Sequence, residues 1–102
     1  MKTFDEKIKY LAELIEKQTI ERLIEKDLGC ETNILNAKTS IKPGKKYTKI
    51  DMGGSGRYMV VNATGEIFGI KAYGVIHRGH FYGTLDTVDN YYWGDYTAYK
   101  KG

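Results

Sequence analysis

The chain has 102 residues, 28% of them charged, and a net charge of +3 at pH 7, which fits one domain with one modest core. Its single cysteine, Cys30, excludes an internal disulfide and favours a reducing compartment. No apolar run is long enough to span a bilayer, and the N-terminus lacks an uninterrupted apolar h-region. We therefore expect no membrane segment, no signal peptide and a cytoplasmic location.

The positive charge is unevenly placed. Residues 1–44 contain eight Lys or Arg and eight Asp or Glu, whereas residues 45–102 contain eight basic and five acidic residues. This excess permits an anionic partner without requiring one. The nine tyrosines fit either a half-exposed sheet face or a binding surface.

Residues 1–29 are predicted to be helical. Thr3 and Glu6 match a capping box, and Gly29 is a natural helix C-cap. A first apolar face holds Phe4, Ile8, Leu11 and Ile15, and a second, on roughly the opposite side, holds Ile20, Leu23 and Ile24. One continuous helix would leave the second stripe to a partner, with a homodimer as one outcome. A helical hairpin would close both faces within the monomer.

Residues 30–46 show no period and are predicted to be an irregular connection. Residues 47–102 read as an antiparallel β region with short turns. Its expected strands are 47–52, 57–61, 66–73, 75–77, 80–85 and 96–100. The predicted fold class is α+β, in which an N-terminal helix or helix pair precedes an antiparallel meander of about five strands within a single domain, 1–102.

Both histidines lie in the stretch His77-Arg78-Gly79-His80. If Arg78-Gly79 formed a hairpin turn, His77 and His80 would face each other across it. Two imidazoles alone do not complete a metal site, and no cofactor is expected. The pair then serves as turn-proximal polar residues, as an anion contact or in catalysis.

The catalytic alternative is a metal-free ribonuclease-like enzyme. Such enzymes use a glutamate, a histidine and an arginine on an antiparallel sheet as base, acid and phosphate clamp. Arg57, Glu66 and either His77 or His80 could supply these groups, although their order along the chain is not that of the family.

Several glycine-rich segments have both a structural and a functional interpretation. The turn at residues 53–57 could cradle an anion or be a hairpin tip. Residues 42–46, Lys-Pro-Gly-Lys-Lys, are typical of a solvated turn. The aromatic–glycine pairs could be stacking platforms for bases or bends in twisted strands. These pairs are Phe68-Gly69, Tyr73-Gly74, Tyr82-Gly83 and Trp93-Gly94.

The β half resembles a group of small uncharacterised proteins of phages and prophages. The resemblance covers residues 47–93 and rests on Tyr47-Thr48-Lys49, Gly54-Ser55-Gly56-Arg57-Tyr58-Met59-Val60, Thr64-Gly65-Glu66-Ile67, Gly69-Ile70-Lys71, Tyr73-Gly74-Val75-Ile76-His77 and Tyr82-Gly83-Thr84-Leu85-Asp86-Thr87. It implies a small accessory protein acting inside a bacterial host cell, and it carries no known activity or site residue.

The leading hypothesis is a non-enzymatic binding protein. Its partner would be nucleic acid, or a host nucleic-acid or defence enzyme that it inhibits. The predicted binding residues are Arg57, Tyr73, His77, Arg78, His80, Tyr82 and Trp93.

Overall fold

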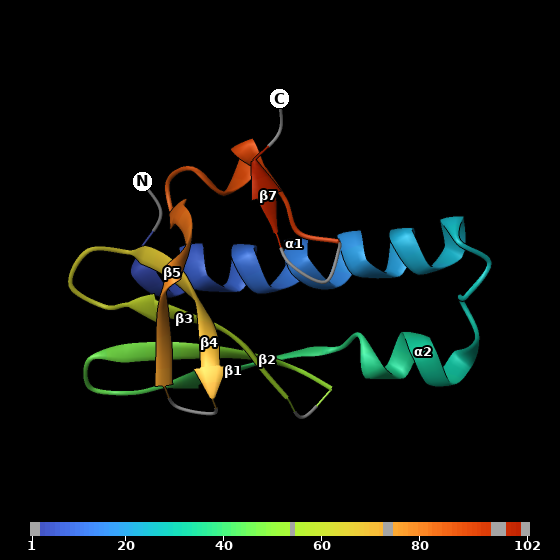
Figure 1. Ribbon diagram of the computed structural model, residues 1–102, viewed down its shortest axis with the longest axis horizontal. Helices are drawn as coiled ribbons and strands as arrows, with labels where there is room; N and C mark the ends of the chain where they lie inside the picture. The colour runs from blue at the N-terminus through green and yellow to red at the C-terminus, as the bar shows by residue number, and fades with distance from the viewer. Residues whose placement is uncertain (1–2, 54, 73–74, 95–97, 101–102) are drawn as a thin grey trace.

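The computed structural model describes residues 3–53, 55–72, 75–94 and 98–100. Two helices, α1 (Phe4–Glu25) and α2 (Glu31–Asn36), precede the sheet (Figure 1). The sheet strands are β1 (Thr39–Pro43), β2 (Tyr47–Met52), β3 (Ser55–Val61), β4 (Glu66–Ala72) and β5 (Val75–Thr84). A 3-10 turn, η1 (Val88–Asn90), and a small strand pair, β6 (Tyr91–Tyr92) and β7 (Tyr99–Lys100), follow. The predicted α+β fold is confirmed.

Helix α1 is continuous through the point where its apolar phase changes. It begins as predicted, because the Thr3 hydroxyl accepts a hydrogen bond from the backbone N–H of Glu6 at 3.2 Å. It ends earlier than predicted, since Asp27 and not Gly29 adopts the positive φ, at 59°. No helix among the described residues is both long and apolar enough to cross a membrane.

The prediction that residues 30–46 form an irregular connection is wrong. They contain helix α2, which has fewer than two turns, and the edge strand β1, whose one large aliphatic residue, Ile41, gives no alternation in the sequence. The side-chain amide of Asn33 donates to the carbonyl of Leu28 at 2.7 Å and ties α2 to the end of α1. Thr39 anchors β1 under α1, because its backbone N–H donates to Glu16 Oε1 at 2.9 Å.

The five large strands form an antiparallel sheet in sequence order, β1-β2-β3-β4-β5. Helix α1 and the C-terminal segment pack on one face of this sheet (Figure 1). The core between them holds Ile8, Leu11, Ala12, Ile15, Ile50, Tyr58, Val60, Ile67, Tyr82, Leu85, Val88, Trp93 and Ala98. We call this side of the sheet the core face.

The opposite side, which we call the outer face, carries a different set of side chains. The strand register aligns one residue from each strand in a single row, namely Lys42, Lys49, Met59, Phe68 and Phe81. The row is cationic at its β1 end and aromatic at its β5 end. Phe81 is 48% exposed, so the aromatic end reaches solvent.

The predicted hairpin turn at Arg78-Gly79 is wrong. Both residues lie within the single strand β5. Gly69 of β4 pairs with His77, while its neighbour Phe68 pairs with Phe81, so one step on β4 corresponds to four on β5. The extra residues form a large bulge, and the strand continues past it.

Candidate functional site

The structure buries part of the surface that the sequence predicts. Trp93 is fully buried, and its indole Nε1 donates to the carbonyl of Val88 at 2.9 Å. Tyr82 is 8% exposed, and its ring packs edge-on against Tyr58, with centroids 5.4 Å apart. Both side chains therefore belong to the core. Tyr73 lies outside the described residues, and Arg78 is placed only by its backbone in the β5 bulge.

The β5 bulge brings the two histidines together by a route that the sequence did not predict. The rings of His77 and His80 stack with centroids 4.0 Å apart and planes 17° from parallel. His80 is exposed and lies over Gly69, where an added Cβ would meet the Cβ of His80 at 3.0 Å. Gly69 thus leaves the space on the core face that the bulge fills.

A second bulge, on β3, changes the direction of the Arg57 side chain. Ile50 pairs with Tyr58 and Asp51 with Gly56, so Arg57 is the extra residue on β3. Its guanidinium lies close to two phenols of the core face. Burial raises the pKa of Tyr58 to about 12, and the Arg57 charge opposes that rise. Burial likewise raises the pKa of Tyr82, again opposed by Arg57.

The stacked histidines do not form a metal centre. The nitrogen lone pairs lie in the ring planes, and two nearly parallel planes do not converge on one ion at about 2 Å. Among the described residues, no group of three or more His, Cys, Asp or Glu could hold a metal.

The residues of the ribonuclease alternative are not assembled. His77 and Tyr58, the neighbour of Arg57, both pair with Gly69 and so share one row of the sheet. Glu66 lies three residues from Gly69 along β4. At the usual rise per residue, this places Glu66 about 10 Å along the strand from the row that holds His77 and the neighbour of Arg57. Its neighbour Ile67 points into the core, so Glu66 points to the outer face, where it accepts a hydrogen bond from the Thr64 hydroxyl at 2.9 Å.

A cationic site lies instead on the hairpin formed by β1 and β2. The sequence has no carboxylate between Glu31 and Asp51, but it has five lysines there: Lys38, Lys42, Lys45, Lys46 and Lys49. We call residues 42–49 the lysine hairpin. Lys42 and Lys49 face each other across it, and the ammonium of Lys42 lies 3.2 Å from the carboxylate of Asp51.

Asn62, in the turn between β3 and β4, fixes the tip of the lysine hairpin. Its Nδ2 donates to the carbonyls of Gly44 at 2.8 Å and Lys45 at 3.1 Å. Its Oδ1 accepts from the Thr48 hydroxyl at 2.8 Å, and its backbone N–H donates to the carbonyl of Lys46 at 2.9 Å. A polar side chain bonded on both sides holds one hairpin orientation.

A pocket of about 490 Å³ opens between this hairpin tip and the β3–β4 turn. Its lining residues are Lys45, Lys46, Tyr47, Val61, Asn62 and Ala63. Tyr47 pairs with Val61 two residues from Lys49, so its ring lies on the outer face beside the cationic end of the row. The pocket therefore combines an aromatic ring, apolar side chains and two ammonium groups.

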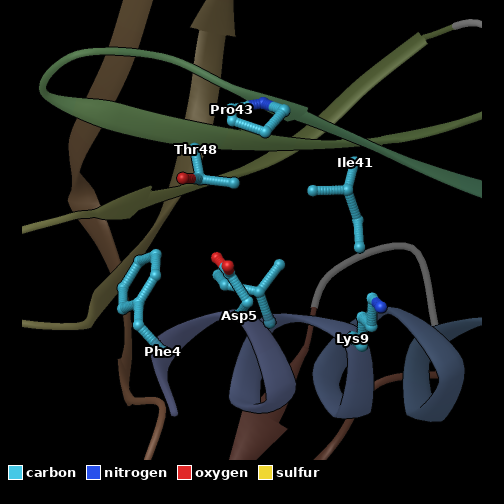
Figure 2. Close-up of a pocket in the computed structure, with 7 residues that line it drawn as sticks. Phe4, Asp5, Lys9, Ile41, Pro43 and Thr48 are labelled. Atoms are coloured by element: carbon cyan, nitrogen blue, oxygen red, sulfur yellow. The ribbon is translucent and has the colours of Figure 1, made fainter.

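A second hollow, of about 310 Å³, lies between α1 and the β1–β2 pair (Figure 2). Ile41, Pro43 and Thr48 point from the sheet towards Phe4, Asp5 and Lys9 on the helix (Figure 2). The Thr48 hydroxyl already donates to Asn62. The hollow is mainly apolar, with one carboxylate and one ammonium, and it offers less to an anion than the lysine hairpin.

Sequence reasoning interpreted residues 42–46 as a solvated turn and so missed this site. The signal that could have found it is the absence of carboxylates over the whole stretch from Glu31 to Asp51, ending in Tyr47. The contribution of Asn62 depends on two turns meeting in space, which one sequence does not reveal.

The chain matches no protein-family model, and no curated protein or solved structure matches it.

Proposed function

We propose that this protein binds nucleic acid through the lysine hairpin, without catalysing a reaction. The observation that carries the proposal is the carboxylate-free lysine stretch, which the β1–β2 pair folds around the pocket beside Tyr47. Ammonium groups neutralise backbone phosphates, and an aromatic ring offers a stacking surface to an unpaired base. The mix of lysines and aromatic side chains on the outer face favours single strands over duplex.

The far end of the row on the outer face offers a second exposed aromatic ring, that of Phe81. Lys49 lies beside Met59, and the row ends in the ring pair Phe68–Phe81, with centroids 5.4 Å apart. Met59 is 2% and Phe68 7% exposed, so beyond Lys49 only the exposed ring of Phe81 in this row could contact a bound strand. The predicted homodimer concerns the helices, a different part of the molecule.

The experiment is a fluorescence-anisotropy titration of end-labelled 12-nucleotide DNA, RNA and duplex DNA. Trp93 is too deeply buried to report directly on a ligand at this site, so the label belongs on the oligonucleotide. We expect saturable binding of both single strands, weakened at least tenfold between about 50 mM and about 200 mM salt.

Absence of binding to all three oligonucleotides at low salt would reject the proposal. It would leave a host protein as the partner that the sequence predicts. Cleavage of the RNA in chelator, abolished by Glu66→Gln, would contradict the non-enzymatic part of the proposal.

A further inference from the structure

A fifth of the chain is folded as helix and turn without burying a single side chain. None of the residues from Glu16 to Asn36 is buried, although this stretch holds the large aliphatic residues Ile20, Leu23, Ile24, Leu28, Ile34 and Leu35. We call residues 16–36 the helical arm. It includes the last turns of α1 and all of α2, which extend past the end of the sheet opposite the β1–β2 turn (Figure 1).

The most exposed apolar side chains of the arm lie on α1, on α2 and in the segment between them. Ile24 is 61%, Leu28 50% and Leu35 54% exposed. Ile24 lies nine positions after the core residue Ile15, which at 100° per residue places it on the opposite side of α1. The sheet of the same molecule therefore cannot cover it. A six-residue helix such as α2 is also too short to be stable without packing.

We infer that the helical arm is the interface of a homodimer, in which α1 and α2 of two copies pack as four helices around a two-fold axis. Ile20 and Ile24 share one face of α1, as does Lys17, one turn earlier. In an antiparallel pair of α1 helices, one chain runs up while the other runs down. Two residues that face each other therefore have numbers that always add up to the same total. When Ile20 of one copy lies level with Ile24 of the other, Lys17 lies level with the turn at Asp27 that directly follows α1, so an ion pair can form beside each apolar contact.

The charges of the arm favour a second copy over nucleic acid. Its basic residues are Lys17, Arg22 and Lys26, and its acidic residues are Glu16, Glu21, Glu25, Asp27 and Glu31. A phosphate backbone would meet net negative charge here, whereas a two-fold arrangement places both signs opposite each other.

The small area of the arm indicates that the affinity of this dimer is low. The α1 part is about 15 Å long, and two neighbouring helices are together about 20 Å wide. This face covers about 300 Å² in projection, well below the roughly 800 Å² per partner of a standard interface. The dimer is therefore weak and reversible.

The test is sedimentation equilibrium of the full chain from about 5 µM to about 500 µM, a range that extends to the high concentrations at which a weak dimer forms. We expect the wild type to shift from the 11.6 kDa monomer to twice that mass. Ile24→Glu should raise the dissociation constant at least tenfold. The matched control is Val75→Glu, because Val75 is 49% exposed on the sheet; it should leave the dissociation constant unchanged, and circular dichroism confirms that both variants fold.

The ion pair is tested by a double-mutant cycle with Lys17→Met and Asp27→Asn, because Asn tolerates the positive φ of residue 27. Each change should weaken the dimer, and the double variant should be no weaker than either single one. A wild type that stays monomeric to the highest concentration would overturn the proposal. So would a dimer that Val75→Glu dissociates and Ile24→Glu does not.

Discussion

The side-chain amide of Asn62 donates a hydrogen bond of 3.1 Å to the backbone carbonyl of Lys45, so the β3–β4 turn holds the tip of the neighbouring hairpin. The same nitrogen donates to Gly44, and the side-chain oxygen accepts from Thr48. Three of the bonds that position the lysines thus depend on one side chain that does not itself carry charge.

Asn62→Ala should therefore weaken both the fold and nucleic-acid binding. Removing a half-buried side chain that makes these bonds is expected to lower the free energy of unfolding by about 1–3 kcal/mol. Urea denaturation measures this loss, and anisotropy measures a several-fold rise in Kd. Asn90→Ala, at an exposed position in η1, is the control that should change neither quantity.

Removing two ammonium groups from the hairpin should reduce the salt dependence of binding. For Lys45→Ala with Lys46→Ala, the slope of log K against log salt should fall by about 1.4, since each phosphate contact to a single strand contributes about 0.7. The control pair is Lys17→Ala with Lys26→Ala, which makes the same change in net charge at the helical arm. Equal slopes for the two double variants would argue against a localised site.

The ring of Tyr47 should contribute by stacking. Tyr47→Ala is expected to weaken single-strand binding by about 1–3 kcal/mol, while Tyr47→Phe keeps the stacking surface and should bind nearly as well as the wild type. Duplex DNA presents no unpaired base, so its affinity should change little with either substitution. Anisotropy titrations of all three proteins with matched oligonucleotides measure these differences.

Burial of Tyr58 predicts a loss of stability in alkali. Its pKa is raised from 10.0 to about 12 in the fold, so the unfolded chain releases the phenolic proton first. The stabilising effect is complete below pH 10 and declines as the pH rises towards 12. At pH 11 the loss is about 1.4 kcal/mol. Urea unfolding at pH 9 and pH 11 should show a smaller decline for Tyr58→Phe, and an unchanged decline would contradict this assignment.

Much of the fold could be predicted because the spacing of apolar residues along a helix or strand indicates which of its faces is buried. The Thr3 cap and the spacing of Ile8, Leu11 and Ile15 predicted the start and the core face of α1, and the structure confirms both. Alternation predicted β2, and the turn before Glu66 predicted the β3–β4 hairpin. Helix α2 was missed because six residues make fewer than two turns, and β1 was missed because Ile41 is its one large aliphatic residue and gives no alternation.

The histidine pair shows why the site was harder to predict than the fold. Its two rings are together, as expected, but a bulge brings them there and not a turn. A bulge depends on the register of the neighbouring strand, and Gly69 on β4 supplies the space for it. Likewise, the sequence predicts Trp93 as a binding residue, whereas its ring completes the core against Tyr58, with centroids 5.2 Å apart.

The most direct test of nucleic-acid binding at the lysine hairpin is a titration of ¹⁵N-labelled protein with an unlabelled single-stranded oligonucleotide, followed by the backbone amide signals. Binding at the proposed site predicts that the largest shifts occur at Lys45, Lys46, Tyr47, Asn62 and Ala63, with smaller shifts at Lys49. Shifts confined to the helical arm or to the His77–His80 bulge, or no shifts at saturating oligonucleotide, would contradict it.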